Sequence, residues 1–405
     1  MRKGKNFPLD GNFLLDFLRS AWQCGWLDDY SEDHFLIRAI ENRLDDFAGK
    51  AQLVGNEINQ QGIVNPDGGI NSTAFSYNFC VNFSVHMQAL ARTFGIDNIK
   101  RFMMHQMSAG KQHYNEDSFF QALSEVSILC FYARHDWTQA LYEPPVIRGV
   151  NSKNPEAQFV KELYNKDTET EQLSAKRIVK VNVEVKTPGF PHDNHIDDKT
   201  VIPTVLLTDN GRKLVRKFCV DRGLVYMDPR ILKIRDFILS AADKFTLPRA
   251  DEFNLLYINW SYRDFPSNSF LEAWALLTNE LNGILTHPKA AESIGIFKNH
   301  LEKITAIIVY TESLEGLMFS DFRYVWQRFG AGPRFRMWVI NDKLRKAEQN
   351  NESDILLHIT NMKPDNPLTQ MAMMDYKIKT ESERHTACKI GKDLVQLIQQ
   401  NTKIY

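Results

Sequence analysis

The sequence predicts an α/β fold class, with a sheet covered by helices, preceded by an all-helical N-terminal module. Three observations support this prediction. Apolar residues recur at helical spacing before residue 113, helical and strand-like apolar stretches alternate after it, and one segment alternates strictly between valine and polar residues. We therefore expect a helical module over residues 1–112, an α/β domain over residues 113–342, and a linker with a closing helix over residues 343–405.

Length and composition limit the class of protein to which the chain can belong. The 405 residues are 43% hydrophobic and 24% charged, which is typical of a globular protein and excludes a disordered or fibrous chain. The net charge is only −1, so any surface that binds nucleic acid must be a local patch. The five cysteines form no C-x-x-C pair, which favours reduced thiols over a disulfide framework or a zinc site. The chain has no secretory signal pattern and no long apolar run, so we expect a cytoplasmic protein without a membrane span.

The helical module contains three segments with helical spacing and carries a negative charge. The segments are FLLDFLRSAW, EDHFLIRAIENRLDDFAGKAQ and FSYNFCVNFSVHMQALARTF. Residues 8–60 contain ten acids and four bases, so this part should not bind a phosphate backbone. We expect a scaffold or a protein-interaction module.

The α/β domain is expected to begin with a helix over residues 115–134. Asn115 is a suitable N-cap, and Glu116 and Asp117 follow in the first turn, where negative charge is favourable. Short extended pieces then precede a polar loop over residues 161–176. Further helices are expected at 210–222, 229–245 and 270–281, and further strands at 253–260, 304–314 and 335–341.

The clearest strand covers residues 178–186, with the sequence IVKVNVEVK. Its valines occupy every second position, so they should enter a core while the polar residues between them face the other way. Glu184 and Lys186 then project from one face, about 7 Å apart. A carboxylate there can bind Mg²⁺, and the neighbouring amine can orient water and stabilise developing negative charge.

Two acids upstream are candidates to complete this site. Glu156 follows Pro155 at the start of an extended run, and it can supply a second carboxylate if that run pairs with the strand over residues 178–186 as a wide hairpin. Glu125 lies among apolar residues of the predicted helix over residues 115–134. A carboxylate near an apolar helix face needs a partner, and a metal cluster is one option.

A Pro-acid pair followed by an acid-x-Lys triplet in an apolar strand resembles the PD-(D/E)xK nuclease superfamily, which includes type II restriction enzymes and resolvases. Pro155-Glu156 and Glu184-Val185-Lys186 stand at the two motif positions. The resemblance implies a restriction-endonuclease-like mixed sheet flanked by helices, with the order helix, three strands, helix, strand. The first of these strands is expected at residues 141–146, and the later helix and strand at 229–245 and 253–260.

The resemblance also implies roles for individual residues. The catalytic residues would be Glu156, Glu184 and Lys186. The ligands of Mg²⁺, or of Mn²⁺ as a substitute, would be Glu125, Glu156, Glu184 and the main-chain carbonyl of Val185. The sequence departs from the family in having Glu rather than the commoner Asp as the first metal acid. The long gap between the two motifs leaves Asp167 or Glu169 as an alternative to Glu156.

The charge distribution favours nucleic acid as the substrate. Residues 209–249 contain ten bases and five acids, and Lys and Arg on such a surface neutralise phosphates. The candidate nucleic-acid-binding residues are Arg212, Lys213, Arg216, Lys217, Lys233 and Lys244. Lys244 lies four residues after Ser240 on the predicted helix, where the alternative is an ordinary solvated face.

We therefore expect a metal-dependent endonuclease that hydrolyses phosphodiester bonds, of DNA rather than RNA, in restriction or phage defence. Its partners would be DNA and a second copy of the chain or another subunit of a defence system. The alternative is a catalytically inactive nuclease-fold protein that acts as a nucleic-acid-binding or assembly subunit. A third interpretation is a protein-interaction module, in which Glu184 and Lys186 form a solvated ion pair on an edge strand and Glu156 and Glu125 are ordinary turn and helix residues.

Overall fold

The computed structural model describes most of the chain in segments. The described residues are 6–9, 11–44, 72–133, 135–144, 153–166, 173–189, 200–203, 206–249, 251–260, 272–273, 275–278, 282–311, 335–340, 394, 396–398, 400, 401 and 403. The chain forms two compact units. The first unit comprises Met1–Tyr142, Phe159–Arg177 and Ser313–Gly332. The second unit comprises Glu143–Gln158, Ile178–Glu312 and Pro333–Tyr405.

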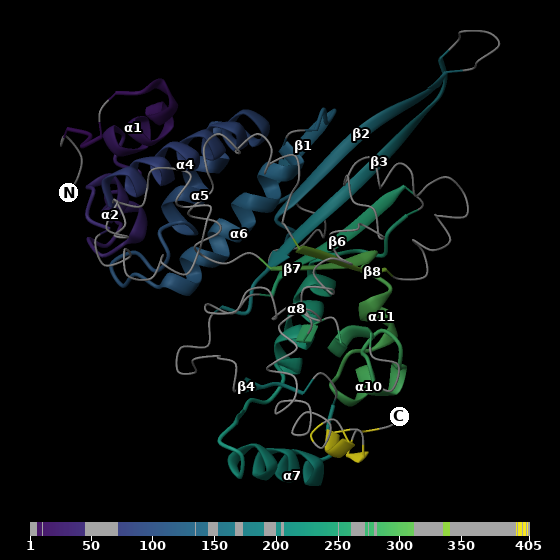
Figure 1. Ribbon diagram of the computed structural model, residues 1–405. Coiled ribbons are helices and arrows are strands. Elements are labelled where there is room, and N and C mark those ends of the chain that lie inside the picture. The colour runs from purple at the N-terminus through teal and green to yellow at the C-terminus, as the bar shows by residue number, and fades with distance from the viewer. Residues whose placement is uncertain are drawn as a thin grey trace. The chain divides into compact units, whose positions relative to one another are not determined.

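The first unit is built mainly from helices (Figure 1). Their bounds are η1 Phe13–Leu15, α1 Asp16–Gln23, α2 Phe35–Ile40, α4 Ser72–Phe94, α5 Ile96–His105 and α6 Glu116–Ala133. Helix α4 packs against α1, α2, α5 and α6, and Phe35 meets Phe79 edge-on, with ring centroids 4.9 Å apart. Because of this packing, α6 belongs to the same unit as the preceding helices. The sequence pattern instead predicts it in the α/β domain that begins at residue 113.

Helix α6 begins where the sequence predicts. The Asn115 side chain accepts a hydrogen bond from the backbone N–H of Ser118 at 2.8 Å, as expected for an N-cap. Glu116 and Asp117 occupy the first turn, where their charge opposes the positive end of the helix dipole. The predicted cap and first turn are therefore confirmed.

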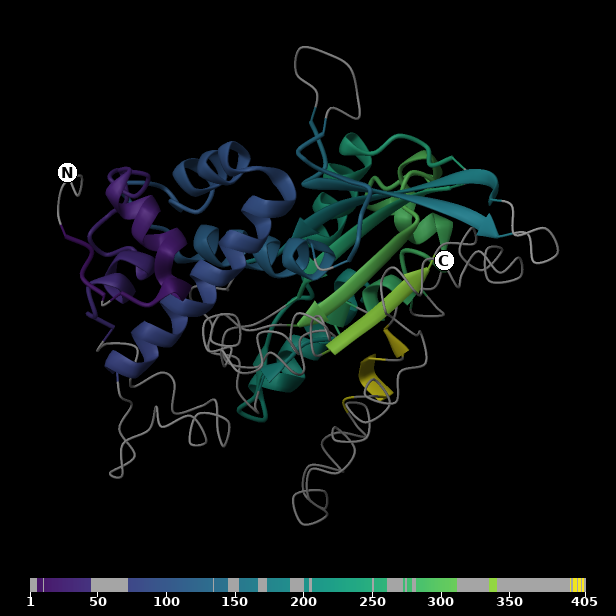
Figure 2. The same ribbon diagram turned by 90° about the horizontal axis from the view of Figure 1, so that it is seen from above.

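In the part of the chain that the structure describes, six strands form one mixed sheet. In their order across the sheet, they are β1 Gln139–Tyr142, β2 Ala157–Lys166, β3 Leu173–Lys186, β6 Glu252–Asn259, β7 Ala306–Thr311 and β8 Phe335–Ile340. Strand β6 is parallel to both β3 and β7, while β7 and β8 are antiparallel, and Figure 2 shows these last two side by side. The predicted mixed α/β class, a sheet with helices, is confirmed.

Strands β2 and β3 are neighbours, as the sequence predicts. The link between them, residues 167–172, is too short for a parallel connection, so the pair is an antiparallel hairpin. The expected polar loop over residues 161–176 is wrong at both ends, because residues 161–166 belong to β2 and residues 173–176 to β3. Backbone pairing between the two strands satisfies their N–H and C=O groups whatever the polarity of the side chains.

The first strand of the sheet lies slightly earlier than expected. Strand β1 covers Gln139–Tyr142, whereas the expected strand covers residues 141–146. Glu143 has a φ of 44°, which is the left-handed region and is incompatible with extended backbone. Residues 145 and 146 lie outside the described residues.

The core of the second unit lies between the sheet and helix α8, Ile231–Lys244. The helix buries Ile234, Ile238 and Ala241, which recur at helical spacing. These side chains pack in one cluster with Leu256 and Ile258 of β6. Figure 1 shows α8 on the same side of the sheet as two short helices, α10 Pro288–Ser293 and α11 Lys298–Leu301. The expected helix at 229–245 and strand at 253–260 are confirmed.

A smaller cluster surrounds helix α7, Asp209–Val220. The short parallel strands β4 Thr200–Val201 and β5 Val225–Tyr226 accompany it. Leu207, Val215 and Cys219 are buried there, and Leu394, Leu397 and Ile398 from near the C-terminus pack against them. None of the helices in the described ranges combines the length and apolar character that crossing a membrane would require.

Candidate active site

Strand β3 presents two different faces, as its alternating sequence predicts. All four valines of the segment at 178–186 are buried. On the other face, Glu184 pairs in register with Leu256 and Lys186 with Ile258. Residues paired across neighbouring strands point to the same face. Glu184 and Lys186 therefore share the face on which α8 packs, and their predicted projection from one face is confirmed.

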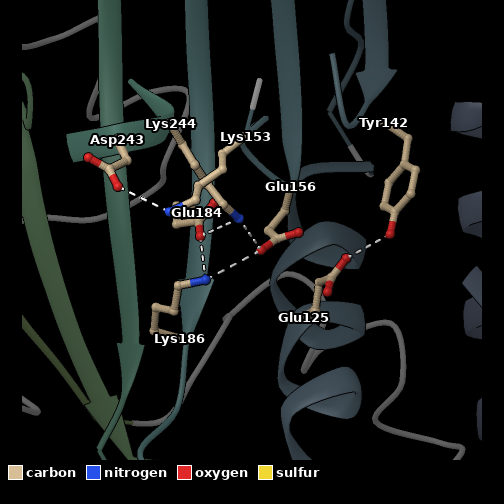
Figure 3. A network of polar contacts seen from close by, with 8 residues as sticks. All are labelled: Glu125, Tyr142, Lys153, Glu156, Glu184, Lys186, Asp243 and Lys244. Carbon is tan, nitrogen blue, oxygen red and sulfur yellow. Dashed lines mark hydrogen bonds and ion pairs between the residues drawn. The ribbon is translucent and has the colours of Figure 1, made fainter. Parts of the chain in front are cut away.

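Glu156 reaches the same place from the start of β2. Its Oε1 lies 3.2 Å from the Nζ of Lys244 and 3.7 Å from the Nζ of Lys186. The Oε1 of Glu184 lies 2.7 Å from the Nζ of Lys244 and is also paired with Lys186. Figure 3 shows these four side chains converging. We call Glu156, Glu184, Lys186 and Lys244 the carboxylate–lysine cluster.

The carboxylate–lysine cluster is largely withdrawn from solvent. The exposed fraction of the side chain is 0% for Glu184, 11% for Glu156, 15% for Lys244 and 20% for Lys186. Strand β3 lies between β2 and β6. The interpretation of Glu184 and Lys186 as a solvated ion pair on an edge strand is therefore wrong.

Lys244 occupies a position that the sequence analysis did not favour. The structure places its ammonium group inside the carboxylate–lysine cluster, so its interpretation as part of a solvated face is wrong. The cause is the packing of α8, because Lys244 comes three residues after Ala241 and continues the stripe formed by Ile234 and Ile238. The helical spacing of Ile234, Ile238, Ala241 and Lys244 is therefore the feature of the sequence that indicates the position of Lys244.

Burial and neighbouring charges shift the pKa values of two cluster members. The pKa of Glu184 is raised to about 7, because burial and then the negative charge of Glu156 raise it more than Lys186 and Lys244 lower it. For Lys244, burial lowers the pKa, but Glu156 and Glu184 outweigh it, so the net pKa is raised. Lys244 therefore keeps its charge, and Glu184 exchanges its proton near neutral pH.

The carboxylates fit a single hard divalent cation. Glu156 and Glu184 both contact the ammonium group of Lys244, so their oxygens lie close together. Within the described part of the chain, the Oε2 of Glu184 is buried and has no hydrogen-bond partner, and such an atom calls for one. Mg²⁺ is commonly held by one or two carboxylates together with water and phosphate oxygens. No group of three or more His, Cys, Asp or Glu side chains suited to a metal occurs among the described residues, so the fit is to a two-carboxylate site.

Glu125 belongs to the first unit, whereas the carboxylate–lysine cluster belongs to the second. Glu125 is buried on α6, and its Oε1 accepts a hydrogen bond from the Tyr142 hydroxyl at 3.2 Å (Figure 3). Its assignment as a third metal acid stays a prediction. The alternative acids Asp167 and Glu169 lie outside the described residues.

A row of side-chain amides runs beside the carboxylate–lysine cluster, and sequence reasoning missed it. Gln158 Nε2 donates to Asn182 Oδ1 at 2.7 Å, and Asn182 Nδ2 donates to Asn254 Oδ1 at 2.7 Å. Asn254 Nδ2 in turn donates to the carbonyl of Thr246 at 2.8 Å. These residues join β2, β3 and β6 on the face of Glu184, and we call Gln158, Asn182 and Asn254 the amide row. The feature of the sequence that indicates the amide row is Asn182, a residue with a short amide side chain in a strand with buried valines on either side.

The remaining predicted nucleic-acid-binding residues are at the surface. Arg212, Lys213, Arg216 and Lys217 are exposed on α7, and Lys233 is exposed on α8. Arg212 pairs with Asp209. Arg216 pairs with Asp228 at 3.1 Å and lies over the ring of Tyr226, 5.2 Å from its centroid.

Comparisons with known proteins add no relative. No protein-family model matches the chain, and searches of curated proteins and of solved structures give no match. The motif residues and their geometry are therefore the basis for assigning a function to this chain.

Proposed function

We propose that this chain is a metal-dependent nuclease that hydrolyses phosphodiester bonds of nucleic acid, with DNA preferred to RNA. The observation that carries the proposal is the convergence of Glu156, directly before β2, with Glu184 of β3, and with Lys186 beside them. The order α6, β1, β2, β3, α8, β6, with β4, α7 and β5 inserted between β3 and α8, supports the proposal, because a restriction-endonuclease-like core has the order helix, three strands, helix, strand. A role in restriction or phage defence belongs to the same proposal.

Each member of the site has a role in this proposal. Glu156 and Glu184, with the main-chain carbonyl of Val185, would hold the metal ion. When bound, Mg²⁺ or Mn²⁺ supplies a Lewis acid that makes bound water more acidic and neutralises charge on the phosphate. Lys186 donates hydrogen bonds from its ammonium group, which orients the attacking water and stabilises the negative charge that develops on the phosphate oxygens.

The partial burial of the site supports hydrolysis chemistry. Charges in a site with little water interact more strongly than they do in solution. Lys186 and Lys244 retain some side-chain exposure, and a phosphate would approach the carboxylate–lysine cluster from that side. The exposed bases on α7 would neutralise the phosphate backbone of a bound strand.

A panel of substrates tests the proposal. The full chain is incubated with plasmid, linear duplex, single-stranded DNA and RNA in Mg²⁺, Mn²⁺ or EDTA. We expect cleavage that requires the metal, is fastest on DNA, and falls roughly 100-fold or more in Lys186→Met. Lys153→Met is the matched control, because Lys153 pairs with Asp243 at 3.1 Å in an exposed ion pair outside the carboxylate–lysine cluster. Cleavage that persists in EDTA, or that Lys186→Met leaves intact, contradicts the proposal.

The alternative is an inactive nuclease fold that binds nucleic acid or assembles with other subunits. One observation favours it: the two carboxylates already face two ammonium groups, so the carboxylate–lysine cluster is charge-balanced without a metal. Electrophoretic mobility shift of the same DNA separates the two functions. Binding without cleavage supports the alternative, and the absence of both supports a protein-interaction module.

A further inference from the structure

Lys244 lies between the two carboxylates of the proposed site. Its Nζ is 3.2 Å from Oε1 of Glu156 and 2.7 Å from Oε1 of Glu184. Lys186 is also paired with Glu184, but it is 3.7 Å from Glu156. Lys244 is therefore the ammonium group that bridges the carboxylates more closely.

A divalent cation held by the same oxygens competes with this ammonium group. Two positive groups in contact with one pair of carboxylates repel each other strongly where little water screens them. The two carboxylates are balanced by two ammonium groups, so no net negative charge remains to attract a further cation. Binding of a divalent cation then requires one ammonium group to leave.

Lys244 is better placed to leave than Lys186. Lys186 is on the same strand as Glu184, and its backbone is fixed by its pairing with β6. Lys244 is the last residue of α8, and the next residue, Phe245, already has extended backbone. Its side chain reaches the carboxylates from the end of the helix. Rotation of this side chain can withdraw the ammonium group without moving the sheet.

We propose that Lys244 is an internal counter-cation that occupies the cation position between Glu156 and Glu184 and must withdraw when a divalent ion binds. Lys244 is thus a residue that sets the affinity of the site for metal, in addition to the motif residues. The inference depends on the proposed function, because it concerns the same two carboxylates.

Metal-binding calorimetry tests the inference without reference to cleavage. Mn²⁺ is titrated into the wild type, Lys244→Met and Lys153→Met, each first checked for folding by circular dichroism. We expect Lys244→Met to bind Mn²⁺ about tenfold or more tightly than the wild type, because a competing positive charge is gone. Lys153→Met removes the same charge from an exposed pair and should bind like the wild type.

A second measurement uses the wild-type protein. The rate of chemical acetylation of its lysines, measured by mass spectrometry, is compared in EDTA and in saturating Mg²⁺. We expect Lys244 to react several-fold faster with Mg²⁺ present, because its ammonium group has moved outward, and Lys153 to react equally in both.

The outcomes separate the two proposals. If the wild type binds Mn²⁺ but Lys244→Met binds no more tightly, or if labelling of Lys244 does not change with Mg²⁺, the counter-cation role is overturned while the metal site stands. If Lys244→Met binds Mn²⁺ and the wild type does not, the role is supported. If neither protein binds Mn²⁺, both the role and the metal-dependent function are overturned.

Discussion

The Oε1 of Glu184 lies 2.7 Å from the Nζ of Lys244, although the two residues are far apart in the sequence. This ion pair links the C-terminal end of strand β3 to the C-terminal end of helix α8. It also places a second lysine in a site whose motif contains only Lys186. The chemistry proposed for the site and the stability of the second unit therefore depend on the same contacts.

Loss of Lys244 should destabilise the metal-free protein. Lys244→Met leaves two buried carboxylates with one ammonium group, and removal of one partner from a buried ion pair costs about 3 kcal/mol or more. Urea denaturation in EDTA should show this decrease in the free energy of unfolding. Lys153→Met should change it by less than about 1 kcal/mol, because its ion pair is exposed. Equal effects of the two substitutions would show that the buried cluster contributes no special stability.

Stability of the metal-free protein should fall as pH rises from about 4.5 to about 7. The pKa of Glu184 is raised from 4.5 to about 7, so the folded state holds its proton more tightly than the unfolded state does. The contribution is full below the unfolded pKa and is lost as pH rises through the folded pKa. Burial is the largest cause of the raised pKa, the charge of Glu156 adds to it, and the charges of Lys186 and Lys244 oppose it.

The substitution Glu184→Gln isolates that contribution. It removes the titrating group and should flatten the pH dependence over the same interval, by an amount on the order of 2 kcal/mol. Thermal unfolding at a series of pH values in EDTA provides the measurement. An unchanged slope in Glu184→Gln would assign the pH dependence to other groups.

The amide row should contribute to stability independently of metal. Asn182→Leu leaves the side-chain amides of Gln158 and Asn254 without one partner each, and an unsatisfied buried polar group costs about 1–3 kcal/mol. We expect a loss of roughly 2–4 kcal/mol in urea denaturation. Lys180→Ala, an exposed position on the same strand, is the control and should have little effect. A neutral result for Asn182→Leu would mean that leucine packing replaces the hydrogen bonds.

Gly211 should be required for the C-terminal residues to pack on α7. A Cβ atom at this position would lie 2.5 Å from Cβ and 2.9 Å from the carbonyl oxygen of Asn401. Gly211→Ala should therefore release the C-terminal segment and increase its cleavage in limited proteolysis. Lys213→Ala on the exposed side of α7 is the control. Equal cleavage of both variants would show that the contact adapts.

The exposed bases of α7 should contribute to nucleic-acid affinity. Replacement of Lys213 and Lys217 by Glu should weaken DNA binding, and it should lower the slope of log affinity against log salt by about 1 for each lost phosphate contact. Replacement of Lys289 and Lys298 by Glu, at exposed positions on α10 and α11, is the charge-matched control. Fluorescence anisotropy over a range of salt concentrations provides the measurement. If the control weakens binding equally, the effect comes from net charge alone.

Elements with a strong local pattern could be predicted from the sequence. The valine alternation of β3 and the Asn115 cap of α6 depend on neighbouring residues, and both are confirmed. The convergence of Glu156 with Glu184 could be predicted because the motif places Glu184 in β3 and Glu156 directly before β2, the other strand of the hairpin.

Features that depend on distant residues were not predicted. The full burial of Glu184 follows from the packing of α8 on the sheet, and the position of Lys244 follows from the same packing. The amide row requires the register of three strands, which the sequence does not specify. The polar residues 161–166 and 173–176 form strands because the backbone of the hairpin pairs regardless of side-chain polarity.

Plasmid cleavage by a matched pair of acid variants tests the central claim most directly. Glu184 is buried in the carboxylate–lysine cluster, whereas Asp243 is exposed and paired with Lys153. In Mn²⁺, we predict that the wild type and Asp243→Asn convert supercoiled plasmid to nicked or linear forms, and that Glu184→Gln, although folded, does not. Equal cleavage by Glu184→Gln and Asp243→Asn, or no cleavage by the wild type on any substrate, would contradict the assignment of this cluster as a nuclease active site.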